Sequence, residues 1–238
     1  MDAQPTLLAN SCNEIALLMS EEDWMARAWM NYERAVYGGD SSAMDDGQRE
    51  LDRVEADLAL ARGRLMHARF MATQQEEPDE LVLLERAADL YLRLGDRRGE
   101  SESLFWIGTF HQVVRGDIDA AAEPLKRAHQ LALKTGDTLT LSEVVRHLAF
   151  LEMETGHPEA ARALLEESVR LRRDMDWMPG LAAAILALAE FESGQGHRDL
   201  AVDLLGQAYA IAEETGAHGV VSWVEQVRTK MRTAPGAP

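Results

Sequence analysis

The stretch VVRGDIDAAAEPLKRA at residues 113–128 recurs in outline twice further along the chain. METGHPEAARALLEES follows at residues 153–168, and SGQGHRDLAVDLLGQA at residues 193–208. Each copy has a glycine at its fourth position, followed by a turn and then by small and large apolar residues at helical spacing. The copies are 40 residues apart. A fixed period of this size is typical of solenoids and other repeat arrays, so the sequence predicts a stack of similar units.

The units are predicted to be helical, because apolar residues recur three or four apart from residue 46 onward and no stretch alternates as a strand would. Two kinds of break alternate between the helices. One kind lies at Gly116, Gly156 and Gly196, where glycine can take the left-handed conformation that ends a helix. The other kind lies at Gly95, Gly136, Asp174-Met175-Asp176 and Gly216. Helices are therefore expected at residues 79–94, 98–114, 118–134, 138–154, 158–174, 179–193, 198–214 and 218–232, two antiparallel helices to each repeat.

The N-terminal part of the sequence is less regular. Residues 5–20 and 21–37 are expected to form a helix pair, with Ser20 and Asp23 as a capping box. GGDSSAMDDG at residues 38–47 is interpreted as a flexible acidic linker and as a domain boundary.

Residues 47–74 are then expected to form one long helix with a continuous apolar stripe, made of Leu51, Val54, Leu58, Ala61, Leu65 and Ala68. The predicted domains are an N-terminal helical segment and linker at 1–46, a repeat domain with a C-terminal capping helix at 47–232, and a disordered tail at 233–238.

Composition narrows the function classes. The 238 residues carry a formal charge of −17, which opposes binding to a phosphate backbone or to an anionic membrane surface. Cys12 is the single cysteine, so no disulfide within the chain and no cysteine-based metal site is expected. The longest apolar run, LAAAILALA at residues 181–189, is far shorter than the ~20 residues of a membrane span. We expect a cytoplasmic protein without direct contact to nucleic acid or membrane.

The repeats resemble the tetratricopeptide repeat. That motif places Leu and a small residue in its first helix, Gly at the turn, and small, large and small residues in its second helix. Small residues let the paired helices approach each other, and the large residue fills the gap between repeats. The positions that match are Leu148, Ala149, Gly156, Ala161, Leu165 and Ser168, and one repeat later Leu188, Ala189, Gly196, Ala201, Leu205 and Ala208.

The resemblance weakens toward the N-terminus. The repeat with Gly116, Ala121, Leu125 and Ala128 has Gly108 and Thr109 where Leu and a small residue belong. The repeat before it keeps only Leu84 and Ala87, with Glu80 where alanine is expected. The period is 40 residues instead of about 34, and the aromatic residue expected in the first helix is replaced by Gln112, Glu152 and Glu192.

The resemblance implies a right-handed α-solenoid of antiparallel helix pairs, with a superhelix whose inner wall is built from the first helix of each repeat. Repeats of this length look like those of bacterial peptide receptors, signalling scaffolds and the sensor regions of actinobacterial regulators. The implied function is regulatory or scaffolding, by binding a protein or peptide without catalysis and without a cofactor.

Counting back from each turn glycine in steps of three or four residues predicts which residues form the inner wall. The helix before Gly116 gives Ser103, Trp106, Phe110 and Val113, and the two that follow give Glu143, Arg146, Phe150 and Met153, then Ala183, Leu186, Glu190 and Ser193. Aromatic anchors with a few directed charges are typical of peptide and ligand grooves, and an arginine can bind a carboxylate bidentately. The predicted binding residues are Arg69, Trp106, Phe110, Arg146, Phe150, Met153 and Glu190.

A structural interpretation of the same residues stays open. Trp106 and Phe110 can instead be buried between neighbouring helices, and Arg146 can be neutralised by Glu143 or Glu190. The sequence has no phosphate-binding loop, no nucleophile elbow and no zinc-protease motif. Glu143 and His147 have a spacing that suits a metal, but two ligands do not make a site, so neither a metal nor a catalytic residue is predicted.

Two further hypotheses follow from the sequence. The concave surface can serve as a closed pocket of a small-molecule sensor or an enzyme, if residues 5–37 fold back across its opening. Alternatively, Val220, Val221 and Trp223 on the last helix can form a face through which the chain dimerises, because a terminal repeat leaves its stacking face without a neighbour.

Overall fold

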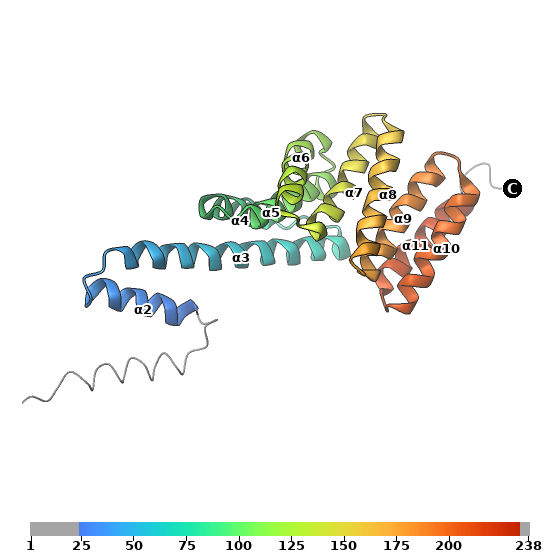
Figure 1. The fold of residues 1–238 in the computed structure, drawn as a ribbon. Coiled ribbons are helices and arrows are strands. Elements are labelled where there is room, and N and C mark those ends of the chain that lie inside the picture. Colours follow the sequence, from blue (N-terminus) through green and yellow to red (C-terminus); the bar gives the residue numbers. More distant parts are fainter. Residues whose placement is uncertain (1–23, 234–238) are drawn as a thin grey trace, which may run out of the picture.

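The computed structural model describes residues 24–233, which form helices throughout and contain no strand. Figure 1 shows the helices stacked in chain order from α3 to α11, so the protein is an all-α solenoid, as the sequence predicted. None of the described helices is both long and apolar enough to span a membrane. The helices are α2 (Trp24–Val36), α3 (Ser42–Thr73), α4 (Glu80–Leu94), α5 (Arg97–Thr109), the π-helix η1 (Phe110–Val114), α6 (Ile118–Thr135), α7 (Thr138–Glu154), α8 (Pro158–Asp174), α9 (Met178–Gly194), α10 (Arg198–Glu214) and α11 (His218–Thr233).

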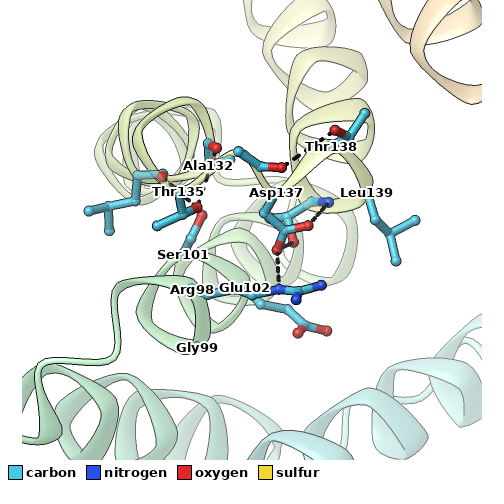
Figure 2. Close-up of polar contacts among 12 residues, drawn as sticks. Arg98, Gly99, Ser101, Glu102, Ala132, Thr135, Asp137, Thr138 and Leu139 are labelled. Carbon is cyan, nitrogen blue, oxygen red and sulfur yellow. Dashed lines mark hydrogen bonds and ion pairs between the residues drawn. The ribbon is translucent and has the colours of Figure 1, made fainter. Parts of the chain in front are cut away.

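Three of the turns end one helix and begin the next in the same way. Gly95, Gly116 and Gly136 take positive φ values of 72°, 63° and 68°, and each is followed directly by an aspartate. The aspartate side chain then accepts a hydrogen bond from a backbone N–H in the first turn of the next helix, as an N-cap does. Asp137 also forms an ion pair with Arg98 on α5, 3.1 Å between Nε and Oδ2, and so ties two first helices together (Figure 2).

Within each repeat the second helix buries a small, a large and a small residue against the first. The triplets on α6, α8 and α10 are at most 1% exposed, which confirms the packing pattern predicted from the sequence. They are Ala121, Leu125 and Ala128, then Ala161, Leu165 and Ser168, then Ala201, Leu205 and Ala208.

The corresponding triplet on α4 contains a glutamate. Glu80 is fully buried beside Leu84 and Ala87, and its Oε1 lies 3.0 Å from Nδ1 of His67 on α3. On the same helix Gly63 allows the close approach, because a Cβ there would lie 2.5 Å from the Leu84 side chain. A buried hydrogen bond thus replaces the alanine contact that the other repeats use at this place.

The π-helix η1 absorbs one extra residue. Gly95 and Gly116 are 21 residues apart, whereas Gly136 and Gly156 are 20 apart. The wider π turn shifts the preceding part of α5 by one position, so Gly108 packs against Leu125 as Ala149 does against Leu165. Ile107 and Gly108 are therefore the Leu-small pair of this repeat, and the apparent mismatch at Gly108 and Thr109 in the sequence is a shift in register.

The N-terminal end differs from the sequence prediction in one respect. Residues 42–47, which were interpreted as part of a flexible linker, form the first turns of α3. The short turn at residues 37–41 leaves α2 packed along the first half of α3, with Arg27 paired to Glu50 and Gly47 beside Asn31. The linker prediction was wrong here because Ser42 to Gly47 continue the helix with Ala43 fully buried. The expected helix at 5–20, the capping box at Ser20 and Asp23, and the tail at 234–238 lie outside the described residues.

The stripe predicted for α3 exists, but it does not face the core. Leu51, Leu58 and Leu65 are 38%, 48% and 62% exposed. The side of α3 that packs against α4 is built from smaller residues and two aromatic rings, namely Ala56, Ala59, Leu60, Gly63, His67 and Phe70. The apolar period correctly predicted a long helix, and a different side of that helix packs against α4.

Candidate functional site

A cavity of about 800 Å³ occupies the inner side of the solenoid. Its wall comes mainly from the first helix of each repeat, as the sequence predicted, and the lining residues repeat at the same intervals along the chain. From α7, α9 and α11 they are Glu143, Arg146, His147 and Phe150, then Ala183, Leu186, Ala187 and Glu190, then Trp223, Gln226, Val227 and Lys230, each set 40 residues after the one before.

On α5 the register of the wall moves by one residue. Phe105, Trp106 and Thr109 line the cavity there, which is 41 residues before Arg146, His147 and Phe150. The extra residue in η1 accounts for this shift. The end of α3 adds His67, Met71 and Gln74, and the α8–α9 region adds Arg172, Trp177, Pro179 and Gly180.

Two arginines share one carboxylate in the cavity wall. Oε2 of Glu143 lies 3.1 Å from Nη2 of Arg146 and 2.7 Å from Nη2 of Arg172. Burial opposes ionisation of Glu143, but the two guanidinium groups outweigh it and hold the pKa of this carboxyl below its usual value. The trio therefore carries a net positive charge.

Arg172 is almost fully buried. Its side chain is 1% exposed, Nη1 donates to the backbone oxygen of Gly180 at 2.8 Å, and the guanidinium lies over the Trp177 ring at 5.0 Å from its centroid. Burial lowers the pKa of Arg172 to about 10 in spite of Glu143, so the group stays protonated at neutral pH. The Nε atoms of Arg172 and of Arg146 are buried and make no hydrogen bond among the described residues.

His147 lies beside this trio in its neutral form. Burial, with the charges of Arg146 and Arg172, holds its pKa well below the usual value. Nη2 of Arg146 lies 3.0 Å from Nε2 of His147, and Nδ1 lies 2.6 Å from Oε1 of Gln112. Because the arginine can only donate, Nε2 is the acceptor and the proton sits on Nδ1, which donates to Gln112. The arrangement fixes the Arg146 side chain from both sides.

The rest of the wall is aromatic and apolar. Phe105 and Phe150 contact the His147 ring edge-on at centroid distances of 5.4 and 5.7 Å, and Arg146 lies over Phe150 at 5.8 Å. On the α9–α11 side, burial raises the pKa of Glu190 even though Lys230 opposes the shift. The cavity therefore combines a broad apolar surface with a few fixed charges, as specific binding sites do.

Four of the seven residues predicted to bind a partner line the cavity, namely Trp106, Arg146, Phe150 and Glu190. Phe110 does not, because it is fully buried in the core beside Leu84 and Leu90. The stepping rule placed it on the wall because it did not account for the extra residue in η1. The structural interpretation was thus correct for Phe110 and for the Arg146–Glu143 ion pair.

The other two predicted residues lie outside the cavity lining. The Arg69 side chain is 60% exposed and pairs with Glu77, with 3.6 Å between Nη1 and Oε1. Met153 is 40% exposed near the end of α7. In the dimer face predicted on α11, Val220 is 7% exposed and lies in the core, whereas Trp223 is 41% exposed and lines the cavity.

Sequence reasoning missed Arg172 and Trp177, although the repeat contains a signal for both. Arg172 is 40 residues from Ala132 and from Ala212, which are fully buried. The turn after it reads MDWM at residues 175–178, where the neighbouring repeats have TGDT and TGAH. A charged residue in a buried alanine position, next to a turn that departs from its copies, is the sequence signal for this part of the cavity lining.

No group of three or more potential metal ligands occurs among residues 24–233. Glu143 and His147, which share the spacing of metal ligands, are each engaged by Arg146. Both arginines would repel a cation at this place.

No protein-family model matches the chain, and no curated protein matches it. The chain is similar to two crystal structures of nearly identical TPR-like repeats from a Podosopora anserina protein assigned as a kinesin light chain. One is 21% identical with a TM-score of 0.40 and covers 72% of this chain and 96% of its own; the other is 20% identical with a TM-score of 0.38 and covers 71% and 95%.

Proposed function

We propose that the protein is a non-catalytic interaction module that binds a segment of a partner protein in its concave cavity. One observation carries the proposal: apolar rings and a net positive trio, Glu143, Arg146 and Arg172, line the same cavity of about 800 Å³. A regulatory or scaffolding role in the cytoplasm accords with this kind of binding. Affinity would come from burial of the aromatic surface, and orientation from the charges.

The partner segment is proposed to carry a carboxylate next to an apolar side chain. Arg146, Arg172 and Lys230 line the cavity together with Glu143 and Glu190, so cations outnumber carboxylates there in a chain whose formal charge is −17. Arg146 has a side chain that is 24% exposed and held by His147 and Glu143. Such a pre-positioned guanidinium binds a carboxylate with little loss of side-chain entropy.

The test begins with a random peptide library displayed on phage and selected on the full chain. We expect the selected peptides to contain an acidic residue one to three positions from an aromatic or aliphatic residue. Their affinities are then measured by calorimetry on the wild type and on Arg146→Met. The substitution keeps the length of the side chain and removes its charge, and we expect binding to weaken at least tenfold, about 1.4 kcal/mol.

Two further variants complete the measurement. Trp106→Ala should weaken binding through lost apolar contact, and Arg170→Met, an exposed arginine on α8 that is absent from the cavity lining, should leave it unchanged. Circular dichroism checks that all variants keep their helices. Peptides that bind equally well to the wild type and to both cavity variants would disprove the proposed site.

A second candidate, a sensor for a small molecule, is favoured by the cavity volume, which lies within the range of about 300–1,000 Å³ typical of ligand pockets. α2 packs along α3 and does not line the cavity, so this helix provides no lid over it. Native mass spectrometry of the purified chain separates the two candidates. A retained small molecule that Arg146→Met loses would support the sensor, and a chain without one leaves the peptide module as the better account.

A further inference from the structure

α3 presents an apolar seam on the side that faces away from α4. Met44, Leu51, Leu58 and Leu65 are each seven residues apart and are between 38% and 64% exposed. Ala61 and Ala68 lie three residues after the last two and are also exposed. We refer to Met44, Leu51, Leu58, Ala61, Leu65 and Ala68 as the α3 seam. A single exposed leucine needs no explanation, but a continuous apolar stripe along a helix of 32 residues does.

The spacing of the seam indicates what covers it. Apolar residues that alternate three and four apart for several turns form the contact line of one helix wound around another. None of the described helices lies over the second half of the seam, since Leu58, Ala61, Leu65 and Ala68 are all exposed. The second half of the seam is therefore open to a helix from outside the described residues.

The charges beside the seam select the partner helix. Each seam leucine is flanked by a charged residue one position before it and another four positions after it. These residues are Glu50 and Glu55 for Leu51, Asp57 and Arg62 for Leu58, and Arg64 and Arg69 for Leu65. One end of the seam is thus acidic and the other basic. A second α3 in antiparallel orientation places acid against base at both ends, whereas a parallel α3 places like charges together at both ends.

The position of α2 favours the same orientation. α2 lies along the first half of α3, where Arg27 pairs with Glu50 and Asn31 contacts Gly47. In a parallel pair the two α2 helices would meet at one end of the seam. Figure 1 shows that α2 lies along only the first half of α3. In an antiparallel pair each α2 would therefore lie beside the half of the other α3 that its own α2 leaves uncovered.

We propose that two copies of the chain associate through their α3 seams in antiparallel orientation, with the two-fold axis between residues 59 and 60. Leu58 of one copy then packs beside Ala61 of the other, and Leu51 beside Ala68. Within one chain Glu55, Arg64 and Arg69 form exposed ion pairs with Arg86, Glu102 and Glu77. Such exposed pairs are weak and can be exchanged for pairs across the interface. Arg62 makes no ion pair among the described residues and is free to reach Glu55 of the second copy.

The first experiment is sedimentation equilibrium of the full chain, from low to high micromolar concentration. We expect the wild type to be a dimer and the double variant Leu58→Glu with Leu65→Glu to be a monomer. The matched control is Leu92→Glu with Leu133→Glu, since these leucines are 51% and 56% exposed on α4 and α6, outside the seam. The control should remain a dimer. Because all four leucines are exposed, circular dichroism should show unchanged helicity in both variants.

The second experiment measures orientation. A spin label at Met44→Cys, in a chain with Cys12→Ser, lies near one end of the seam. An antiparallel dimer separates the two labels by about 45 Å, because some 30 residues of helix at about 1.5 Å each lie between them. A parallel dimer brings them within about 15 Å, roughly a helix diameter plus linkers.

Three outcomes overturn the proposal. They are a wild type that stays a monomer, a seam variant that behaves like the control, and labels that lie close together. A monomer that begins to dimerise when residues 1–20 are removed would instead assign the seam to the apolar segment of the same chain.

Discussion

Arg172 shows how one residue can turn a structural repeat into a site. Its counterparts Ala132 and Ala212 only fill space between helices, and they are fully buried. Arginine at this position must be neutralised and hydrogen-bonded, because an isolated buried charge is too costly. Glu143 and the oxygen of Gly180 meet that demand, and the resulting contacts hold Arg146 at the cavity surface.

His147 should make stability depend on pH. Its folded pKa is below 6.5 because of burial and the nearby Arg146 and Arg172, while the unfolded chain binds a proton at about 6.5. Below pH 6.5 the unfolded state therefore takes up more protons, and stability falls by up to about 1.4 kcal/mol per pH unit until the folded pKa is reached.

Urea unfolding between pH 7.5 and pH 5 measures this effect. We expect the difference in unfolding free energy between wild type and His147→Gln to shrink as the pH falls, because only the wild type carries the titrating group. His218→Gln, at an exposed histidine, should keep the pH dependence of the wild type. A constant difference across the range would show that His147 does not titrate below its usual value.

Asp176 occupies a turn position where the equivalent repeats have glycine. Its φ of 56° is left-handed, which costs free energy in a residue with a Cβ. Asp176→Gly should raise the free energy of unfolding by about 0.5 kcal/mol. The substitution relieves the backbone strain in the folded state, and this gain is partly offset because glycine has more conformational entropy in the unfolded chain. Gly136→Ala, at a φ of 68°, should lower it by about 1 kcal/mol, and chemical denaturation measures both. Equal effects of the two changes would contradict this account.

At the scale of the element, η1 is the least regular part of the stack. It lets α5 satisfy two geometric requirements that a regular α-helix of this length cannot satisfy at the same time. Gly108 must face Leu125, and the helix must still reach the turn at Gly116. One wider turn satisfies both, at the cost of weaker hydrogen-bond geometry.

Deleting one residue from this helix should therefore be tolerated. Removal of Val113 gives α5 the 20-residue spacing of its neighbours, and we expect the free energy of unfolding to change by less than about 1 kcal/mol. Removal of Met153, the equivalent residue on α7, rotates one side of a regular helix by about 100° and should cost more than about 3 kcal/mol. Urea titration of both variants tests the difference, and similar losses would show that η1 has no such role.

At the scale of the whole molecule, stability is shared between neighbours. α11 packs its buried residues Val220, Val224, Val227 and Met231 against the cluster of α9 and α10, and it closes one side of the cavity. α3, α4 and α5 have a separate core around Leu84 and Leu90, and α5, α6 and α7 have another around Leu125. In such a one-dimensional stack each unit depends mainly on the units next to it.

Truncation after residue 216 should therefore act locally. Amide hydrogen exchange should rise in α9 and α10, which lose their covering helix, and stay close to that of the full chain in α5 and α6. Peptide binding in the cavity should also be lost with Trp223 and Lys230. A uniform rise in exchange across all helices would mean that the stack unfolds as one cooperative unit instead.

Part of the site was predictable from the period alone. Counting back from Gly156 and Gly196 placed Arg146, Phe150 and Glu190 on the inner wall, because α7 and α9 are regular helices. The same count failed at Phe110, where η1 changes the number of residues per turn. Arg69 and Met153 lie on the correct helices but beyond the cavity, since the extent of a concave surface depends on how the helices curve.

The sequence by itself determined the helices, their turns and their pairing. Each of these depends on local chemistry, such as glycine at a left-handed turn, aspartate at an N-cap, and alanine and leucine at helical spacing. The tertiary structure decided which faces are used. It turned the leucines of α3 outward, buried Phe110, and brought Arg172 to Glu143 from different helices. These outcomes depend on the geometry with which one helix pair stacks on the next. No local pattern in the chain encodes that geometry.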